Sequence, residues 1–246
     1  MAEQRQPTLG ILMLEGKMAT VRGCMAGPET FPYPVVREVV AGASAPRTAE
    51  DALALLPLYQ DAAQRLERRG VDVITANCGL IALLQQDLAR AVSVPVVTSS
   101  LVVVPALSQL LGARHRIGIL TFFADAVGEA NFAACGWSSR SIPVSVAGVG
   151  HSPAWLEFLR TKQIDADLRR QLRDDLLHVV RDLLDREPDI GALVSECTML
   201  PAVLDYIREA VPVPVHDILT TLDWAMSGVR RGPVPAADRV PAEVAR

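Results

Sequence analysis

The sequence predicts an α/β fold of two similar lobes, each a parallel-sheet α/β sandwich, with a cleft between them. Short aliphatic runs alternate with longer helical patterns along nearly the whole chain, which is typical of a parallel sheet covered by helices on both faces. Half of the 246 residues are hydrophobic and only 4% are aromatic, as in cores built from Val, Ile and Leu strands. A strand that ends in a polar turn with a cysteine occurs twice, once in each half of the chain.

Eight aliphatic runs are predicted to be strands. Most are rich in β-branched residues and are bounded by Gly, Pro or Asp, which favours strands over short buried helices. The predicted strands cover residues 9–14, 35–40, 71–75, 94–98, 117–121, 142–147, 190–195 and 213–216. Eight strands would also permit a β/α barrel, but such a barrel is built from eight regular repeats, and here the units fall into two groups.

Two long helices are predicted between the strands. Thr48 and Asp51 form a capping pair that begins the first helix, which runs to about Arg69 and is ended by Gly70. The second helix spans residues 165–186 and stops before a proline. The side chains predicted to face the core are Leu53, Leu56, Tyr59, Ala63 and Leu66 in the first helix and Leu168, Leu172, Leu176, Val179 and Leu183 in the second.

The repeated cysteine turn divides the chain into two lobes. The segments VDVITANCGLIALL and IGALVSECTMLPAVL each run from a strand through a cysteine turn into a helix. We expect one lobe to comprise residues 1–98 and 215–246 and the other residues 99–214, so that the two crossings form a hinge. The glycine-rich loop GCMAGPETFPYP is expected to cover the cleft, with Thr30, Phe31 and Tyr33 available to a ligand. The tail from Gly232 onward, which contains three prolines, is expected to be loosely ordered.

The composition argues against several classes of protein. The formal net charge is -4, and no run of Lys and Arg alternates with aromatic residues, so nucleic acid is not an expected partner. The apolar stretch 99–111 is too short to span a bilayer, so no membrane association is expected. The polar N-terminus lacks the apolar segment of a signal peptide, and we expect a cytoplasmic location. The four cysteines are spread singly and the histidines lack metal-ligand spacing, so neither a disulfide framework nor a metal site is expected.

Cys78 and Cys197 each follow a predicted strand at the start of the next helix. The carboxyl ends of parallel strands form the ligand-binding edge of such a sheet, and a helix start presents N–H groups and the positive end of a dipole. Both features favour a thiolate, so we expect each cysteine pKa to be lowered from its usual value of roughly 8.5. On opposite walls of a cleft, one cysteine could remove a proton from an α-carbon while the other delivers a proton to the opposite face. For either turn alone, a buried cysteine without chemistry is an equally good interpretation, and the repetition of the turn favours the functional one.

At these turns the sequence resembles the aspartate/glutamate racemase superfamily, over nearly the whole chain. The matching segments, in the order of the family, are LGILML, GPETFPYPV, ITANCGLIALLQ, VPVVTSS, RIGILT and SECTMLP. The loop after the first strand is similar to that of the branch with a GNPxTFxFPV-like loop. The resemblance implies a two-lobed α/β fold with the active site in the cleft, no cofactor, and catalytic cysteines at Cys78 and Cys197.

The resemblance also implies that polar groups beside the two cysteines hold the carboxylate of a substrate. The matching candidates are Asn77 and Gly79 at the first turn, Thr198 at the second turn and Thr121 at the end of its strand. Ser99, at the junction of the lobes, is a further candidate donor, although it could instead cap the helix that begins near Leu101. Donors that are preorganised in a dry cleft are well suited to stabilise an oxyanion.

The chain departs from the family pattern at several positions. Gly79 and Leu80 stand where glutamate racemases have Asn and Thr, Met199 stands where they have His, and their early DSGxGG loop is absent. These differences argue against glutamate as the substrate and suggest a less polar cavity. Relatives that resemble arylmalonate decarboxylase keep the second cysteine alone, so the presence of Cys78 argues against simple decarboxylation.

We therefore expect a cofactor-independent racemase or epimerase of an amino acid or related small carboxylate. One alternative is a cis–trans isomerase of an unsaturated diacid, with Cys78 adding covalently as a nucleophile. Another is a binding protein that closes on a small acid without chemistry. The expected partner is a small-molecule carboxylate, and a homodimer is among the assemblies that the resemblance allows. The sequence leaves open whether Cys24 or His216 joins the site. Glu196, beside Cys197, could assist its partner thiol or point to solvent, and as an adjacent anion it would oppose thiolate formation.

Overall fold

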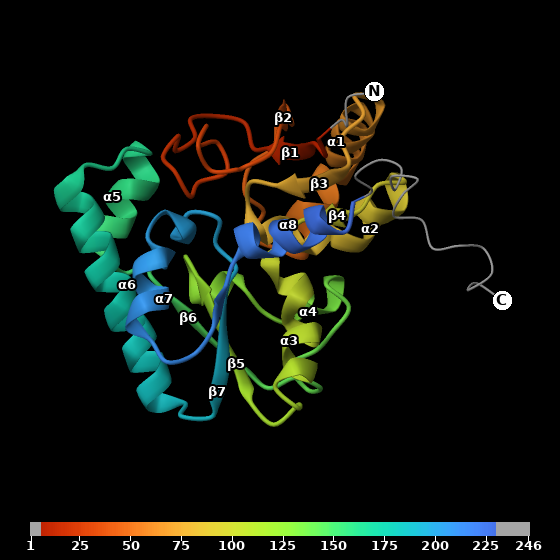
Figure 1. Ribbon diagram of the computed structural model, residues 1–246. Helices are drawn as coiled ribbons and strands as arrows, with labels where there is room; N and C mark the ends of the chain where they lie inside the picture. Colours follow the sequence, from red (N-terminus) through yellow and green to blue (C-terminus); the bar gives the residue numbers. More distant parts are fainter. Residues whose placement is uncertain (1–5, 230–246) are drawn as a thin grey trace, which may run out of the picture.

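Two parallel four-stranded sheets form the centres of the two lobes in the computed structural model, which describes residues 6–229 (Figure 1). The first sheet has the order β2-β1-β3-β4 and contains β1 (Leu9–Met13), β2 (Val35–Val39), β3 (Val73–Ala76) and β4 (Val96–Val97). The second has the order β6-β5-β7-β8 and contains β5 (Arg116–Thr121), β6 (Val144–Gly148), β7 (Ile190–Ser195) and β8 (Val215–His216). All eight predicted strands are confirmed, and the fold class is the predicted two-lobed α/β fold.

The two sheets repeat one topology, which explains the repeated cysteine turn. In each sheet the strand that precedes a cysteine, β3 or β7, lies between two parallel neighbours. All residues of β3 are buried, as are all but one in β7, because helices cover both faces of each sheet. The two turns therefore emerge at equivalent places on the carboxyl edges of the two sheets.

The first lobe is covered by α1 (Ala49–Arg68), α2 (Gln85–Ala91) and α8 (Ile218–Ser227). Thr48 caps α1 and forms the predicted reciprocal capping pair with Asp51. Tyr59, Ala63 and Leu66 are fully buried, as predicted. The prediction for Leu53 is wrong, because Ala52 takes the inward position in that turn and Leu53 is 57% exposed.

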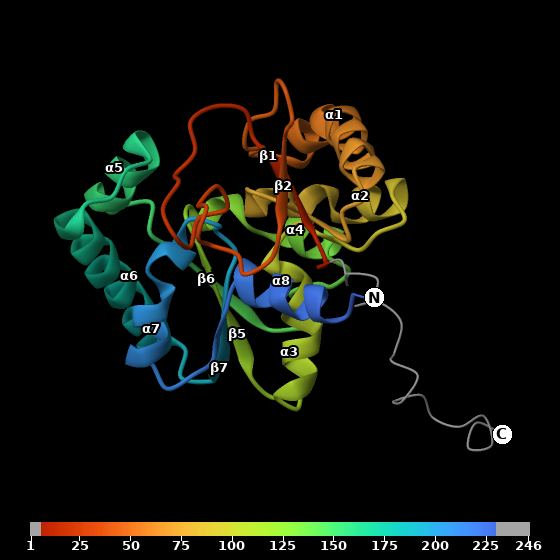
Figure 2. The same cartoon turned by 45° about the horizontal axis from the view of Figure 1, so that its top comes forward.

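The second lobe is covered on one side by α3 (Val104–Leu110) and α4 (Glu129–Ala134), and on the other by α5 (Pro153–Thr161), α6 (Ala166–Arg186) and α7 (Leu204–Ala210) (Figures 1 and 2). The long α6 begins at the cap residue Asp165, close to the predicted start. Leu172, Leu176 and Leu183 are buried as predicted, whereas Leu168 and Val179 are partly buried. The helices on the two faces form separate cores, so each lobe is a three-layer sandwich.

The chain returns to the first lobe just after β8. Val215 and His216 pair with β7 and so complete the second sheet, whereas Ile218 and Leu222 of α8 pack in the core of the first lobe. The expected boundary at residue 215 is therefore two residues early. The tail from Gly232 onward lies outside the described residues. Within residues 6–229, no helix combines the length and the hydropathy needed to cross a membrane.

The loop between β1 and β2 crosses to the second lobe, as expected of a loop that covers the cleft (Figures 1 and 2). Ala19 and Cys24 of this loop belong to the core of the second lobe. Gly23 has φ +93, and a Cβ there would lie 2.6 Å from the carbonyl oxygen of Pro201, so only glycine allows this close approach. The loop thus ties the two lobes together at one end of the cleft.

Candidate active site

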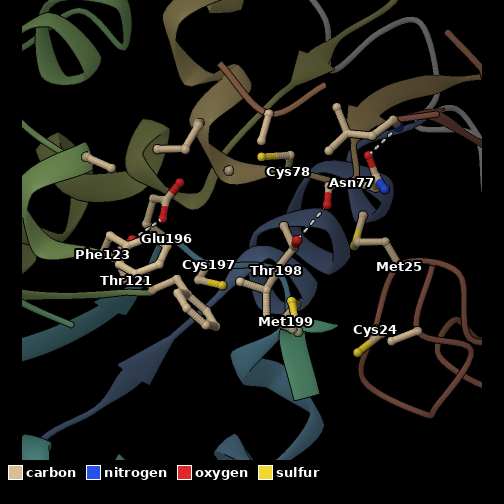
Figure 3. A pocket seen from close by; sticks show the side chains of 18 of the residues that line it. Cys24, Met25, Asn77, Cys78, Thr121, Phe123, Glu196, Cys197, Thr198 and Met199 are labelled. Atoms are coloured by element: carbon tan, nitrogen blue, oxygen red, sulfur yellow. Dashed lines mark hydrogen bonds between the residues drawn. The ribbon is translucent and has the colours of Figure 1, made fainter. Parts of the chain in front are cut away.

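A cavity of about 600 Å³ lies where the carboxyl ends of the two sheets meet. The residues directly after β1 and β3, the last residue of β5 and the residues after β7 all line it, so both lobes contribute. Its polar and charged lining residues are Arg47, Asn77, Thr121, Asp125, Lys162, Glu196 and Thr198, together with three cysteines. Cys78 and Cys197 come from opposite lobes and face this common space (Figure 3).

Cys78 precedes a short 3-10 helix, Gly79–Leu84, which leads into α2. The backbone N–H groups of Leu80 and Ile81 favour its thiolate, as expected at a helix start. Burial nevertheless dominates and, together with the charge of Glu196, raises the pKa of Cys78 to about 12. The expectation of a lowered pKa is therefore wrong for this cysteine, because the cavity removes the thiol from water.

Cys197 follows Glu196 and lies before a second short 3-10 helix, Leu200–Ala202. Burial raises the pKa of Cys197, and the charge of Glu196 raises it further, against the N–H groups of Met199 and Leu200. The charge of Cys78 also raises it, so the two thiols are close enough to influence each other. The lowered pKa expected for Cys197 is wrong for the same reason as for Cys78. These raised pKa values favour the thiol form of both residues at neutral pH.

Glu196 is the charged group nearest in sequence to Cys197, and it turns into the cavity rather than toward solvent. Its side chain is 2% exposed. The hydroxyl of Thr121 donates to its Oε2 at 2.6 Å, while Oε1 is buried and has no hydrogen-bond partner among the described residues. Burial raises the pKa of Glu196 to about 7, and the Thr121 hydrogen bond opposes that rise. This carboxyl group can therefore change protonation state near neutral pH.

Four of the five predicted binding residues line the cavity, and most of their side-chain groups are already bonded. The hydroxyl of Thr198 donates to the backbone oxygen of Asn77 at 2.6 Å and so joins the two turns across the lobes. The side-chain oxygen of Asn77 accepts from the N–H of Leu14 at 2.8 Å. Thr121 donates to Glu196 instead of facing a ligand. Gly79 also lines the cavity but offers its backbone alone.

Ser99 does not line the cavity. Its side chain is fully buried and accepts from the N–H of Leu101 at 3.3 Å, which makes it the cap of the 3-10 helix Ser100–Val103. The capping alternative is therefore the one that the geometry supports. His216 is also outside the lining residues, whereas Cys24 is among them, with its pKa raised to about 12 mainly by burial.

Lys162 supplies a half-buried cation on the wall contributed by the second lobe. It ends α5 in the left-handed region, with φ 59, which is uncommon for a residue with a side chain. Burial lowers the pKa of Lys162, and the charges of Cys197, Cys24 and Cys78 oppose this, so Lys162 interacts electrostatically with all three cysteines. Arg47, the other lining cation, is exposed.

The rest of the lining is aliphatic, aromatic or thioether. It consists of Leu14, Met18, Ala19, Met25, Ala26, Ala45, Leu80, Phe122, Phe123, Ala126, Leu159 and Met199. This agrees with the less polar cavity that the departures from the glutamate racemase pattern suggest. Within residues 6–229, no group of three or more His, Cys, Asp and Glu side chains could hold a metal ion.

Comparison with known proteins finds relatives by sequence and by fold, while no family model matches the chain. A dimethylsulfoniopropionate lyase from Durusdinium sp. clade D is 25% identical over 230 residues, which cover 91% of this chain and 75% of that protein. Dimethylsulfoniopropionate lyase 7 from Emiliania huxleyi is 25% identical over 237 residues, which cover 92% of this chain and 68% of that protein.

Solved structures give the fold. A mutant of arylmalonate decarboxylase in a sulfate-associated form matches with a TM-score of 0.60 at 18% identity, over 92% of this chain and 97% of that one. A glutamate racemase isoform from Bacillus anthracis matches with a TM-score of 0.55 at 16% identity, over 91% and 82% of the two chains. The chain therefore shares the two-lobed α/β fold of these enzymes.

Glu196 and Lys162 are charged lining residues, one buried and one half-buried, that the sequence analysis did not assign as catalytic or binding residues. The sequence does place Glu196 next to Cys197. The direction of the Glu196 side chain, however, depends on the space that Gly79 leaves in the other lobe. Lys162 carries no such signal, because a lysine at the end of an ordinary surface helix is unremarkable in sequence. Only the packing of α5 beside the cysteine turns brings it to the cavity.

Proposed function

We propose that the protein is an enzyme that removes the proton α to the carboxylate of a small substrate, with Cys78 and Cys197 as its acid/base pair. The observation that carries this proposal is that two strand-end cysteines, equivalent in the repeated topology, line one cavity from opposite lobes. General acid–base catalysis needs groups within reach of the proton on the appropriate faces of the reacting carbon.

The proton inventory balances without any other reactant. The thiolate of one cysteine takes the α-proton and becomes a thiol, and the electron pair of the C–H bond passes into the substrate carboxylate as an enediolate. The thiol of the other cysteine then gives its proton to the opposite face of the same carbon and becomes a thiolate. The product is the mirror-image configuration at that carbon, and the reverse reaction exchanges the roles of the cysteines. A racemase or epimerase of this kind uses no cofactor.

The substrate carboxylate is best accommodated by Lys162 and by the backbone N–H groups at the two turns. Asn77, Gly79, Thr121 and Thr198 remain the binding positions that the family resemblance implies. Thr121 and Thr198 act by shaping the turns, since their hydroxyl groups bond to Glu196 and to the Asn77 backbone. The methionine and phenylalanine side chains of the lining favour a substrate whose remainder is apolar or soft rather than a second carboxylate.

A second candidate is β-elimination, and the sequence relatives favour it. Those relatives are dimethylsulfoniopropionate lyases, and the match extends over nine-tenths of this chain. The first step is the same: a cysteine thiolate takes the proton α to the carboxylate. The electron pair then forms a carbon–carbon double bond, and the bond from the β-carbon to sulfur breaks. With dimethylsulfoniopropionate as substrate, the products are acrylate and dimethyl sulfide, and the proton stays on the cysteine.

Proton NMR in deuterated water separates the two reactions. The full chain is incubated with amino acids, hydroxy acids, hydantoins, diacids and dimethylsulfoniopropionate, and the signals of each compound are followed. Loss of an α-proton signal with the rest of the spectrum intact supports racemisation, while new vinyl signals support elimination. Racemisation should vanish in both Cys78→Ser and Cys197→Ser, and elimination should vanish in the variant that lacks the cysteine base. A compound that binds to the protein but undergoes neither change, across the whole panel, would contradict both reactions and favour a binding protein.

A further inference from the structure

The carboxyl group of Glu196 lies between the two cysteine turns, with one oxygen held and the other available (Figure 3). Thr121 fixes Oε2, which sets the orientation of the side chain. Oε1 is buried, has no hydrogen-bond partner among the described residues, and belongs to a side chain that lines the cavity. A buried polar atom without a hydrogen-bond partner destabilises the folded protein, so we expect Oε1 to have a role in the function of the site.

Gly79 makes room for this carboxyl group in the opposite lobe. A Cβ at position 79 would lie 2.3 Å from Oε1 of Glu196 and 2.1 Å from the Glu196 backbone oxygen. Any other residue would therefore push Glu196 away from the turn that carries Cys78. As a result, an acid that adjoins Cys197 in the chain also lies against the residue that follows Cys78.

Glu196 is coupled electrostatically to the thiols around it. Its charge is the second-largest cause, after burial, of the raised pKa of both Cys78 and Cys197. It acts in the same way on Cys135, which follows α4 and is not among the lining residues. The other charged groups of the lining are Lys162 and the exposed residues Arg47 and Asp125. Neutralising Glu196 removes the negative charge that most opposes a thiolate at either turn.

We propose that Glu196 holds the proton of whichever cysteine acts as the base, so that one carboxyl group serves both turns. This inference rests on the proposed function. At the start, Glu196 is a carboxylate and both cysteines are thiols. The proton of one thiol moves to Glu196, and the resulting thiolate takes the α-proton of the substrate. The second thiol then protonates the opposite face, and Glu196 returns its proton to that second sulfur.

This sequence restores the enzyme to its starting state after each turnover. Without a shared acid, a two-thiol racemase ends each turnover with the thiolate on the other cysteine and must exchange protons with water before it can repeat the same direction. In this scheme Glu196 is a positioning residue and not a catalytic one, because it exchanges protons with the thiols and does not contact the substrate. Its place between the lobes explains why a single acid suffices.

The test measures the reactivity of each cysteine toward iodoacetamide between pH 5 and pH 10, with the full chain and per-cysteine mass spectrometry. When a thiol passes its proton to Glu196, the pair as a whole loses no proton. The population of this thiolate therefore stops rising with pH once Glu196 has titrated. We expect the alkylation rates of Cys78 and Cys197 to level off near pH 7 and to rise again at higher pH. In Glu196→Gln the rates should rise by about tenfold per pH unit without a plateau.

The variant should also raise these rates at pH 8, by about three- to tenfold, because a shift of half to one pKa unit is typical of one nearby charge. Cys24, whose pKa shift has no contribution from Glu196, is the internal control and should keep its rate. Glu196→Asp, which keeps the charge, should retain a plateau, and Asp174→Asn, at an exposed position of α6 outside the cavity lining, should behave as the wild type. Absence of the plateau in the wild type, or an equal rise at Cys24, would overturn the proposal.

Turnover provides the second readout. With a substrate found by NMR, Glu196→Gln should lower the rate of α-proton exchange by about a hundredfold, even though its thiolates are more abundant. A merely structural role would not raise thiol reactivity and lower turnover together, and unchanged turnover would overturn the proposal. The alkylation experiment needs no substrate. Failure of the proposed function, shown by full activity in Cys78→Ser and Cys197→Ser, is therefore distinct from failure of this inference.

Discussion

In the first lobe, Cys78 follows β3 and is succeeded by Gly79, whereas in the second lobe Cys197 follows β7 and is flanked by Glu196 and Thr198. Each turn presents backbone N–H groups to its own sulfur atom. Gly79 of the first turn leaves space, and Glu196 of the second turn fills it with a carboxyl group. Repetition of the fold thus places two equivalent thiols, while divergence of their neighbours places one acid between them.

The two turns therefore work as a single unit. A glycine is needed at position 79 because Glu196 approaches it from the other lobe. Thr198 also reaches across the lobes, since its hydroxyl donates to the backbone oxygen of Asn77. A substitution at one turn should therefore be felt at the other. The two cysteines can act symmetrically as acid and base even though only the second turn carries a charged residue. Substitutions at the cysteines and at Glu196 should distinguish these two properties.

The largest expected effects come from replacing each sulfur atom in turn. Cys78→Ser and Cys197→Ser should each lower turnover by about 10²- to 10⁴-fold, because a serine hydroxyl is a far weaker acid than a thiol and its alkoxide is not populated as a base. Rates of proton exchange and of product formation by NMR provide the measurement. Losses of similar size support the racemase reaction, in which both thiols act. Markedly unequal losses would assign the base to one turn, as elimination requires.

Glu196 should make the stability of the protein depend on pH between about pH 4.5 and pH 8, below the range in which Cys78 of the first turn titrates. Its pKa is about 7 in the folded protein and 4.5 in its unperturbed form, so the folded state holds the proton more tightly. Its contribution to stability is therefore fully present below pH 4.5 and is lost as the pH rises through 7. The loss is about 3 kcal/mol, from 1.36 kcal/mol per pKa unit.

Urea unfolding of the wild type and of Glu196→Gln at pH 4.5 and pH 8 measures this contribution. The difference in unfolding free energy between the two proteins should change by about 3 kcal/mol in favour of the variant as the pH rises. Comparing the two proteins cancels the contributions of surface acids such as Asp51 and Glu67, whose pKa values are lowered. A difference that stays constant with pH would mean that Glu196 is ionised throughout and that the asymmetry between the turns is small.

Gly79→Ala tests the space that the first turn provides. The added methyl group would overlap both the backbone and the side chain of Glu196, so we expect a loss of about 1–3 kcal/mol in unfolding free energy. Gly228→Ala is the matched control, because its Cβ would have an ordinary contact, 3.6 Å from the Ala225 oxygen. The control should stay within about 0.5 kcal/mol. Equal stability of the two variants would show that the turns can move apart freely.

The strands, the caps and the paired cysteines could be predicted from sequence because their signals are local. The β-branched runs bounded by Gly and Pro, and the Thr48–Asp51 cap, depend on neighbours within a few residues. The pKa values of Cys78 and Cys197 could not be predicted in the same way. The N–H groups at each turn do favour a thiolate, but the burial that outweighs them is produced by a cavity built from both lobes.

The same distinction separates the binding residues. Ser99 fits a cap and a ligand contact equally well in sequence, and only its burial away from the cavity favours the cap. Thr121 was correctly placed at the cavity, but it bonds to Glu196, which is 75 residues away in the chain. Residues whose role depends on a partner distant in the chain are those for which local sequence reasoning fails.

Thr198→Val addresses the remaining link between the turns, and its effect should be the smallest. The hydroxyl of Thr198 donates to the backbone oxygen of Asn77 at 2.6 Å, and valine keeps the shape of the side chain without the donor. We expect a loss of about 1 kcal/mol in unfolding free energy. Thr161→Val is the control, since that hydroxyl bonds to Glu157 within its own helix.

The two threonine variants also differ in what they should do to the site. Thr198→Val frees the first turn from the second, so the iodoacetamide reactivity of Cys78 should change although the substitution lies beside Cys197. Thr161→Val should leave both cysteines at the wild-type rate. If Thr198→Val altered the reactivity of Cys197 alone, the two turns would be independent walls of one cavity. A change at Cys78 would instead establish that the hydrogen bond across the lobes transmits structure from one turn to the other.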